Sequence, residues 1–137
     1  MEECLFLHLV DMVFKSIKII YKMRILNIFE STLLEKISDK YPEIKSHLPY
    51  LLVENIQITG VGMYINFLYK ESRKILNKII PENCFLSVQN NIQIKKLEYG
   101  LGYEVIIKNG KIEFIEIITY GELWDGDTTG FIVIDEQ

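Results

Sequence analysis

The sequence contains little of what most specialised protein classes require. It has two cysteines, Cys4 and Cys84, two histidines, His8 and His47, and three prolines in 137 residues. Two isolated thiols without a C-x-x-C spacing do not form a disulfide framework and favour a reducing compartment, so we expect a cytoplasmic protein. These side chains could supply a structural zinc site only by chance convergence, so we expect no metal and no cofactor.

A long hydrophobic run is also missing. Residues 5–21 are strongly apolar, but three charged side chains interrupt them, whereas a bilayer span needs about 20 apolar residues. Two glutamates stand where a secretory signal carries basic residues. We expect an amphipathic helix here, so that residues 1–22 form a helical extension of the domain. Attachment to a membrane surface is the first alternative. The second is that Met23 is the true start.

Basic residues are fewer than acidic ones. Fifteen Lys and Arg stand against nineteen Asp and Glu, for a net charge of −4, and residues 113–137 contain no basic side chain at all. An acidic surface repels phosphate backbones, which argues against direct binding of nucleic acid. It favours a basic protein partner or a cation. Hydrophobic residues make up 49% and charged residues 25%, as in an ordinary folded protein, so residues 1–137 are expected to form a single domain.

The hydrophobic pattern changes period along the chain, which indicates an α+β fold. Thr32 and Glu35 have the spacing of a capping box, which predicts a helix that begins near Thr32 and ends at Tyr41-Pro42. From Tyr50 onward apolar residues alternate with polar ones, most clearly over residues 61–69. We expect N-terminal helices packed on a twisted antiparallel sheet of about four to six strands.

The strongest local signal is a hairpin at Asn109-Gly110, a dipeptide that tolerates the positive φ angles of a type I′ turn. Counting outward from this turn pairs Val105 with Phe114 and Tyr103 with Glu116. Glu116 would then lie on the core face, where a carboxylate is costly unless it is paired. It would be a recessed acid in a pocket, or else the strand bulges, or the side chain reaches the rim and bonds Tyr103.

Residues 125–136 have the ligand spacing of a calcium-binding loop. Asp125, Asp127, Thr129, Gly130 and Glu136 fall at loop positions 1, 3, 5, 6 and 12. The segment after Gly130 is β-like, however, so the second helix of such a site is missing. A plain loop between two strands is the preferred interpretation, and a small-ligand or calcium-binding module without catalysis is the alternative function.

No pattern typical of an enzyme is present. The serines lie in no nucleophile elbow, and the paired glycines at 60–62 and 100–102 precede strands and not a phosphate-binding helix. Aromatic residues surrounded by acidic ones are typical of protein interfaces, although a lone Trp can equally cover the edge of a core. The predicted partner-binding residues are Glu113, Glu116, Tyr120, Glu122, Trp124, Asp125 and Asp127.

Five short segments carry a family resemblance: Leu48-Pro49-Tyr50, Thr59-Gly60-Val61-Gly62, Gly100-Leu101-Gly102-Tyr103, Asn109-Gly110-Lys111-Ile112 and Tyr120-Gly121-Glu122-Leu123-Trp124. Over residues 48–124 their order resembles small bacterial immunity proteins of polymorphic and contact-dependent growth inhibition toxin systems. Such domains often have Leu-Glu-Gly and a Pro after Trp, where this chain has Ile115-Glu116-Ile117 and Asp125. The resemblance implies a monomer or weak dimer that binds a cognate toxin protein, a basic nuclease for example.

Overall fold

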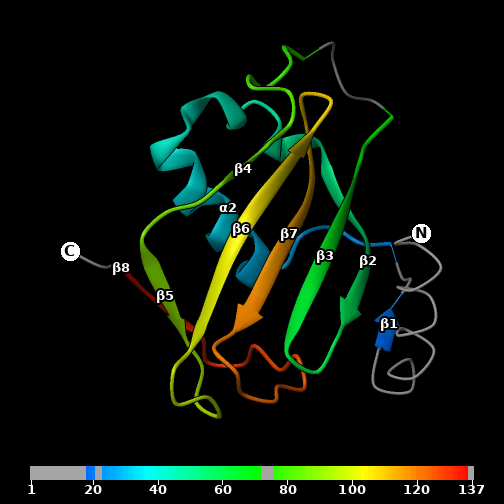
Figure 1. Cartoon of the computed structure of the whole chain (residues 1–137). Coiled ribbons are helices and arrows are strands. Elements are labelled where there is room, and N and C mark those ends of the chain that lie inside the picture. Colours follow the sequence, from blue (N-terminus) through cyan, green and yellow to red (C-terminus); the bar gives the residue numbers. More distant parts are fainter. Residues whose placement is uncertain (1–17, 21–22, 72–75, 136–137) are drawn as a thin grey trace, which may run out of the picture.

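The computed structural model describes residues 18–20, 23–71 and 76–135. Within them one α-helix and eight strands form an α+β fold, with the helix on one side of a single antiparallel sheet (Figure 1). The helical elements are α2 (Ile28–Lys40) and the 3₁₀ turns η2 (Pro42–Ile44) and η3 (Leu48–Tyr50). The strands are β1 (Lys18–Ile20), β2 (Leu51–Ile58), β3 (Gly62–Tyr69), β4 (Cys84–Leu86), β5 (Asn90–Gln93), β6 (Leu101–Lys108), β7 (Lys111–Thr119) and β8 (Ile132–Asp135).

The expected fold class is confirmed in its coarse form, with two differences. The sheet has eight strands among the described residues, in the order β1-β2-β3-β7-β6-β5-β8 with β4 also paired to β6, and not four to six. The strands that the sequence did not predict include β1 and β4, which are three residues long, too short to produce a visible alternation. Strand β8 coincides with the β-like segment expected after Gly130. In the part of the N-terminal region that the structure describes, the expected set of helices is one α-helix followed by two single turns.

The helix α2 begins four residues earlier than predicted. Asn27 is its N-cap: the side chain of Asn27 accepts the backbone N–H of Glu30, and Glu30 accepts the backbone N–H of Asn27. The predicted cap Thr32 instead donates its hydroxyl to the carbonyl of Ile28 within the helix. Both pairs have the three-residue spacing of a capping box, and only the first lies where the chain leaves the extended conformation.

The core lies between α2 and the inner face of the sheet. Leu33, Leu34 and Ile37 of α2 are buried there, as the sequence predicted. They face alternate residues of the central strands, such as Ile65 of β3 and Val105 of β6, both fully buried. None of the described helical elements covers the outer face of the sheet, because α2 lies on its other side (Figure 1).

A β-bulge changes the hairpin register. The turn at Asn109-Gly110 forms as predicted, with φ angles of 53° and 73°, and Lys108 pairs with Lys111. The next pairs are Ile107 with Ile112 and then Ile106 with Phe114, so Glu113 is an extra residue in β7. A bulge moves every later side chain to the opposite face.

The bulge therefore overturns the predicted pairs beyond it. Tyr103 pairs with Ile117 and not with Glu116, and Glu116 pairs with Glu104. Glu116 lies on the outer face, so the prediction of a core-facing carboxylate opposite Tyr103 is wrong. The alternative in which the strand bulges is confirmed.

The N-terminal segment is described only in part. Most of the predicted helix over residues 5–21 lies outside the described residues, but Lys18–Ile20 form strand β1, paired with residues 56–58 of β2. That part of the helix prediction is wrong. Among the described residues no helix is long and apolar enough to cross a membrane.

Candidate functional site

Three connections meet at one end of the sheet: the β2–β3 turn, the β5–β6 loop and the loop from β7 to β8. We call residues 59–61, 95–99 and 120–129 together the loop end. The backbone N–H of Trp124 donates to the carbonyl of Gly60 at 2.7 Å, and that of Thr119 donates to Val61 at 3.0 Å. These bonds fix the start of the β7–β8 loop on the β2–β3 turn.

Glu122 joins the same loop to the β5–β6 loop. Its carboxylate accepts the backbone N–H groups of Glu98 at 2.9 Å and Tyr99 at 3.1 Å, and its carbonyl accepts the Thr119 hydroxyl at 2.8 Å. A carboxylate that accepts two N–H groups fixes backbone on both sides. Glu122, one of the predicted partner-binding residues, therefore has a bracing role inside the loop end.

Asp125 and Asp127 form a compact charged turn around Lys96. The Oδ1 atom of each carboxylate accepts a backbone N–H two residues ahead, from Asp127 at 2.9 Å and Thr129 at 3.0 Å. Their Oδ2 atoms lie 3.3 and 3.6 Å from the ammonium of Lys96. The hydrogen bonds from Asp127 and Lys96 lower the pKa of Asp125, and those from Thr129 and then Lys96 lower the pKa of Asp127.

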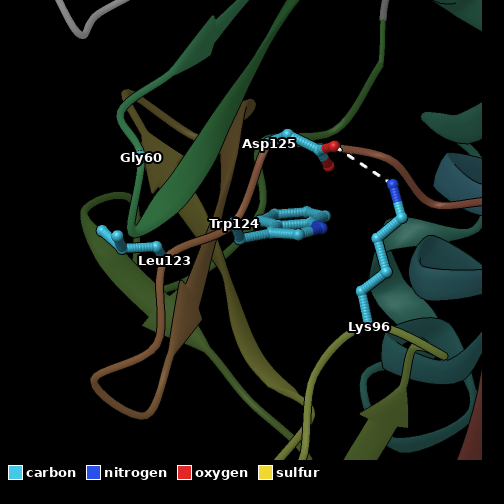
Figure 2. A pocket seen from close by; sticks show the side chains of 5 residues that line it. All are labelled: Gly60, Lys96, Leu123, Trp124 and Asp125. Atoms are coloured by element: carbon cyan, nitrogen blue, oxygen red, sulfur yellow. Dashed lines mark hydrogen bonds and ion pairs between the residues drawn. The ribbon is translucent and has the colours of Figure 1, made fainter.

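This arrangement bears on the calcium alternative. The segment lies between strands β7 and β8, as the preferred interpretation held. The ammonium of Lys96 lies against both carboxylates, where a metal cation would have to bind. Figure 2 shows its contact with Asp125. Among the described residues no group of three or more acidic, His or Cys side chains is placed to hold a metal. Glu136, the last of the proposed ligands, lies outside the described residues.

Trp124 and Leu123 have opposite environments although they are adjacent. Trp124 is 4% exposed, and its indole N–H donates to the carbonyl of Asp127 at 3.1 Å. Leu123 is 85% exposed and points away from the indole, beside Gly60 (Figure 2). Gly60, Lys96, Leu123, Trp124 and Asp125 line an open hollow of about 380 Å³. Trp124 thus anchors the loop in the core, and Leu123 is the side chain that this anchor presents to solvent.

Leu123 belongs to a wider group of exposed apolar side chains at the loop end. The exposed members on the three connections are Val61, Tyr99, Tyr120 and Leu123. The same connections also carry charged residues: the acidic Glu98, Asp125 and Asp127 and the basic pair Lys95 and Lys96. Exposed apolar groups within a polar rim are typical of protein–protein interfaces.

Two of the predicted partner-binding residues lie elsewhere on the sheet. Glu113 is the exposed bulge residue near the hairpin turn, and Glu116 lies midway along β7 on the outer face. Its neighbour on β3 is Tyr64, whose pKa is raised by burial and by the Glu116 carboxylate. The structure therefore brings Tyr120, Glu122, Trp124, Asp125 and Asp127 together at the loop end and leaves Glu113 apart from them. Glu116 lies outside the loop end but lines a second hollow together with Tyr120.

Sequence reasoning missed Leu123 and Lys96. Nothing in the local pattern distinguishes Leu123 from a core residue. Leu123 and Trp124 are adjacent apolar residues, and the sequence does not show which of the two is buried. Lys96 lies 29 residues before Asp125, so only the fold brings the two together. Comparison with protein families, with functionally characterised proteins and with solved structures finds no significant match.

Proposed function

We propose that this chain is an immunity-type protein that binds and neutralises a cognate toxin domain by surface complementarity, without catalysis. One observation carries the proposal. Leu123 is 85% exposed in a loop whose neighbouring residues Glu122 and Trp124 are fixed by hydrogen bonds to other loops. A large apolar side chain held rigidly in water contributes nothing to folding.

Rigidity matters because it reduces the entropy that binding must overcome. Side chains and loops that are ordered on binding each cost about 0.5–1.5 kcal/mol, and a loop that is already ordered avoids this cost. Interface energy is typically concentrated in a few apolar and aromatic side chains near the centre of the contact. Leu123 and Tyr120 at the loop end meet that description.

The charge of the chain supports a basic partner. The net charge is −4, and Asp125 and Asp127 together outweigh the single Lys96 that they share. Such a surface accelerates encounter with a basic protein at low salt, more than it raises the final affinity. A cytoplasmic toxin domain that cleaves nucleic acid would carry the complementary charge, and a monomeric inhibitor would suffice to cover it.

Co-expression tests the proposal. The chain is produced together with a candidate toxin domain taken from its gene neighbourhood, and cell survival and complex formation are measured. We expect survival with the natural chain and loss of survival with Leu123→Asn, which removes the apolar contact without changing charge. Ile25→Asn is the matched control, since Ile25 is 71% exposed on the segment before α2.

The controls decide which part of the proposal holds. Survival with Ile25→Asn and death with Leu123→Asn, at equal protein levels, support binding through the loop end. Equal survival with both variants contradicts that location. Failure of the natural chain to protect cells or to form a complex contradicts the function itself.

A further inference from the structure

A second hollow lies on the outer face of the sheet, and Leu123 is not among the residues that line it. Strand β6 pairs with β4 as far as Val105 and with β5 only at Leu101, so no described strand pairs with residues 102–104 on that side. The gap opens a hollow of about 230 Å³. Its lining residues are Ser87, Val88, Asn90, Gly102, Tyr103, Glu104, Glu116, Ile118 and Tyr120.

Two carboxylates stand opposite each other in this hollow. Glu104 of β6 and Glu116 of β7 are register partners on the outer face, and both are half-buried. Among the described residues no cation pairs with either of them and no group donates a hydrogen bond to them. Like charges directly opposite in an antiparallel pair destabilise the sheet. Folding alone gives no reason for this pair.

Asn90 adds a third acceptor without a donor. It is 8% exposed and lines the same hollow. Its Nδ2 donates to the Tyr103 hydroxyl at 3.2 Å, whereas its Oδ1 has no hydrogen-bond partner among the described residues. Buried acceptors are rarely left unpaired, because the lost hydration is not replaced. The unmatched groups in and beneath the hollow are therefore all acceptors, with the Asn90 Oδ1 atom below its surface and closed to solvent.

The hollow has an apolar wall as well. Gly102 leaves room for the Tyr120 ring, since a Cβ atom at Gly102 would lie 2.7 Å from the Tyr120 hydroxyl oxygen. Ile118, 47% exposed, lies between the Tyr120 ring and the two glutamates. An aliphatic stem could pack on this wall while its charged end reaches the acceptors.

We propose that this hollow receives an arginine side chain of the protein partner, a role that rests on the proposed function and names the partner's chemistry. A guanidinium group has five donors in a planar fork, which suits acceptors on two strands better than the compact ammonium of lysine. A divalent cation fits less well, because calcium takes six to eight oxygen ligands. A second copy of this chain would bring its own acidic pair against the first.

The test uses a small probe and does not require the toxin. N-acetylarginine amide is titrated into the full chain, and backbone and Asn side-chain resonances are followed by NMR. We expect shifts at residues 101–105 and 115–118 and at the Asn90 side-chain amide. N-acetylcitrulline amide, a neutral isostere, should cause none. The double substitution Glu104→Gln/Glu116→Gln should raise the dissociation constant for the arginine probe at least tenfold. The control substitution Glu113→Gln should raise it less than twofold.

Each other outcome overturns the inference. These outcomes are equal shifts with the citrulline probe, shifts confined to Asp125 and Asp127, an unchanged constant in the double variant, or a stronger response to calcium than to the arginine probe. Because removing the like-charge pair should not impair folding, the thermal midpoint of the double variant serves as a check. If the arginine probe does not bind, the natural chain can still protect cells in the co-expression assay. A negative titration therefore contradicts the arginine site without contradicting the proposed function.

Discussion

The guanidinium of Arg24 contacts both carboxylate oxygens of Glu30, each at 2.7 Å, in a bidentate pair at the start of α2. Glu30 is 1% exposed and also accepts the N–H of the cap residue Asn27. The pair, chiefly through its hydrogen bonds, raises the pKa of Arg24. Arg24 itself forms a backbone bridge with Val53 of β2, so one carboxylate joins the helix to the sheet.

Replacing Glu30 should be strongly destabilising. Glu30→Ala removes the bond from the Asn27 N–H to the Glu30 carboxylate and leaves a partly buried guanidinium without its partner, and breaking such a pair costs about 3–5 kcal/mol. We expect a loss near the lower limit, since the Arg24 side chain is 31% exposed. Chemical denaturation measures it. Glu35→Gln on the exposed face of the same helix should change the free energy of unfolding by less than about 0.5 kcal/mol. Equal effects of the two substitutions would contradict the account.

A second buried chain of hydrogen bonds passes through Tyr69. The N–H of Ile112 donates to the Tyr69 hydroxyl at 2.9 Å, and that hydroxyl lies 2.8 Å from Nδ1 of His47, whose Nε2 contacts the carbonyl of Asn77 at 2.8 Å. Tyr69→Phe should lower the free energy of unfolding by about 1–3 kcal/mol, because it leaves buried groups unpaired. Tyr120→Phe, at an exposed ring, is the control and should have no measurable effect.

Leu123 and Trp124 should respond in opposite ways to truncation. Trp124→Ala removes a buried ring and its hydrogen bond and should cost about 3–5 kcal/mol, whereas Leu123→Ala should stay within about 0.5 kcal/mol. Thermal unfolding followed by circular dichroism compares the two. The sequence has one Trp, so the fluorescence of Trp124 in the natural chain also reports on the loop end directly. A large loss of stability in Leu123→Ala would show that Leu123 serves folding.

The acidic turn predicts a specific dependence on pH. Because folding lowers the pKa values of Asp125 and Asp127, their contribution to stability is complete above the ordinary carboxyl pKa. It is lost as the pH falls through the lowered values. Lys96→Met should raise both pKa values in an NMR titration of the carboxyl carbons, yet leave them below the ordinary value because the backbone N–H bonds remain. Unchanged titrations would mean that Lys96 does not contact the turn in solution.

Tyr103 predicts a shift in the alkaline range. Burial raises the pKa of its phenol to about 12, although the hydrogen bond from Asn90 acts in the other direction. The protonated form is favoured in the folded state, so the associated stability is intact below the ordinary phenol pKa and is lost as the pH rises through about 12. Ultraviolet titration of the natural chain and of Tyr103→Phe should differ by one phenol that ionises near that pH. If Tyr103→Phe instead lost a phenol that ionises near pH 10, the buried position of Tyr103 would be contradicted.

The fold was predictable where one local pattern dominates. The alternation over residues 61–69 and the Asn109-Gly110 turn indicate β3 and the β6–β7 hairpin correctly. The register was not predictable beyond the turn, because nothing in the sequence around Glu113 announces an extra residue. The start of α2 was predicted at Thr32, because Thr32 and Glu35 have the same spacing as Asn27 and Glu30. The contact of Arg24 with Glu30 favours the Asn27 cap, and only the fold brings that contact about.

The candidate site was predictable only as a stretch of chain. The acidic and aromatic content of residues 120–127 marks the loop, but which side chains face water depends on contacts with residues 60 and 96–99. Trp124 is buried because the β2–β3 turn holds its backbone, and Leu123 is exposed for the same reason. Glu104 was not predicted as a site residue, because only the strand register places it opposite Glu116.

The central claim is that a rigid loop end binds a protein partner. Hydrogen exchange of the chain with and without the toxin domain that the proposed function requires tests it most directly. We predict that the hydrogen-bonded amides of Glu98, Tyr99, Trp124 and Asp127 exchange slowly in the free chain and more slowly in the complex. Protection that appears on α2 and the segment before it, with the loop end unchanged, would contradict the claim.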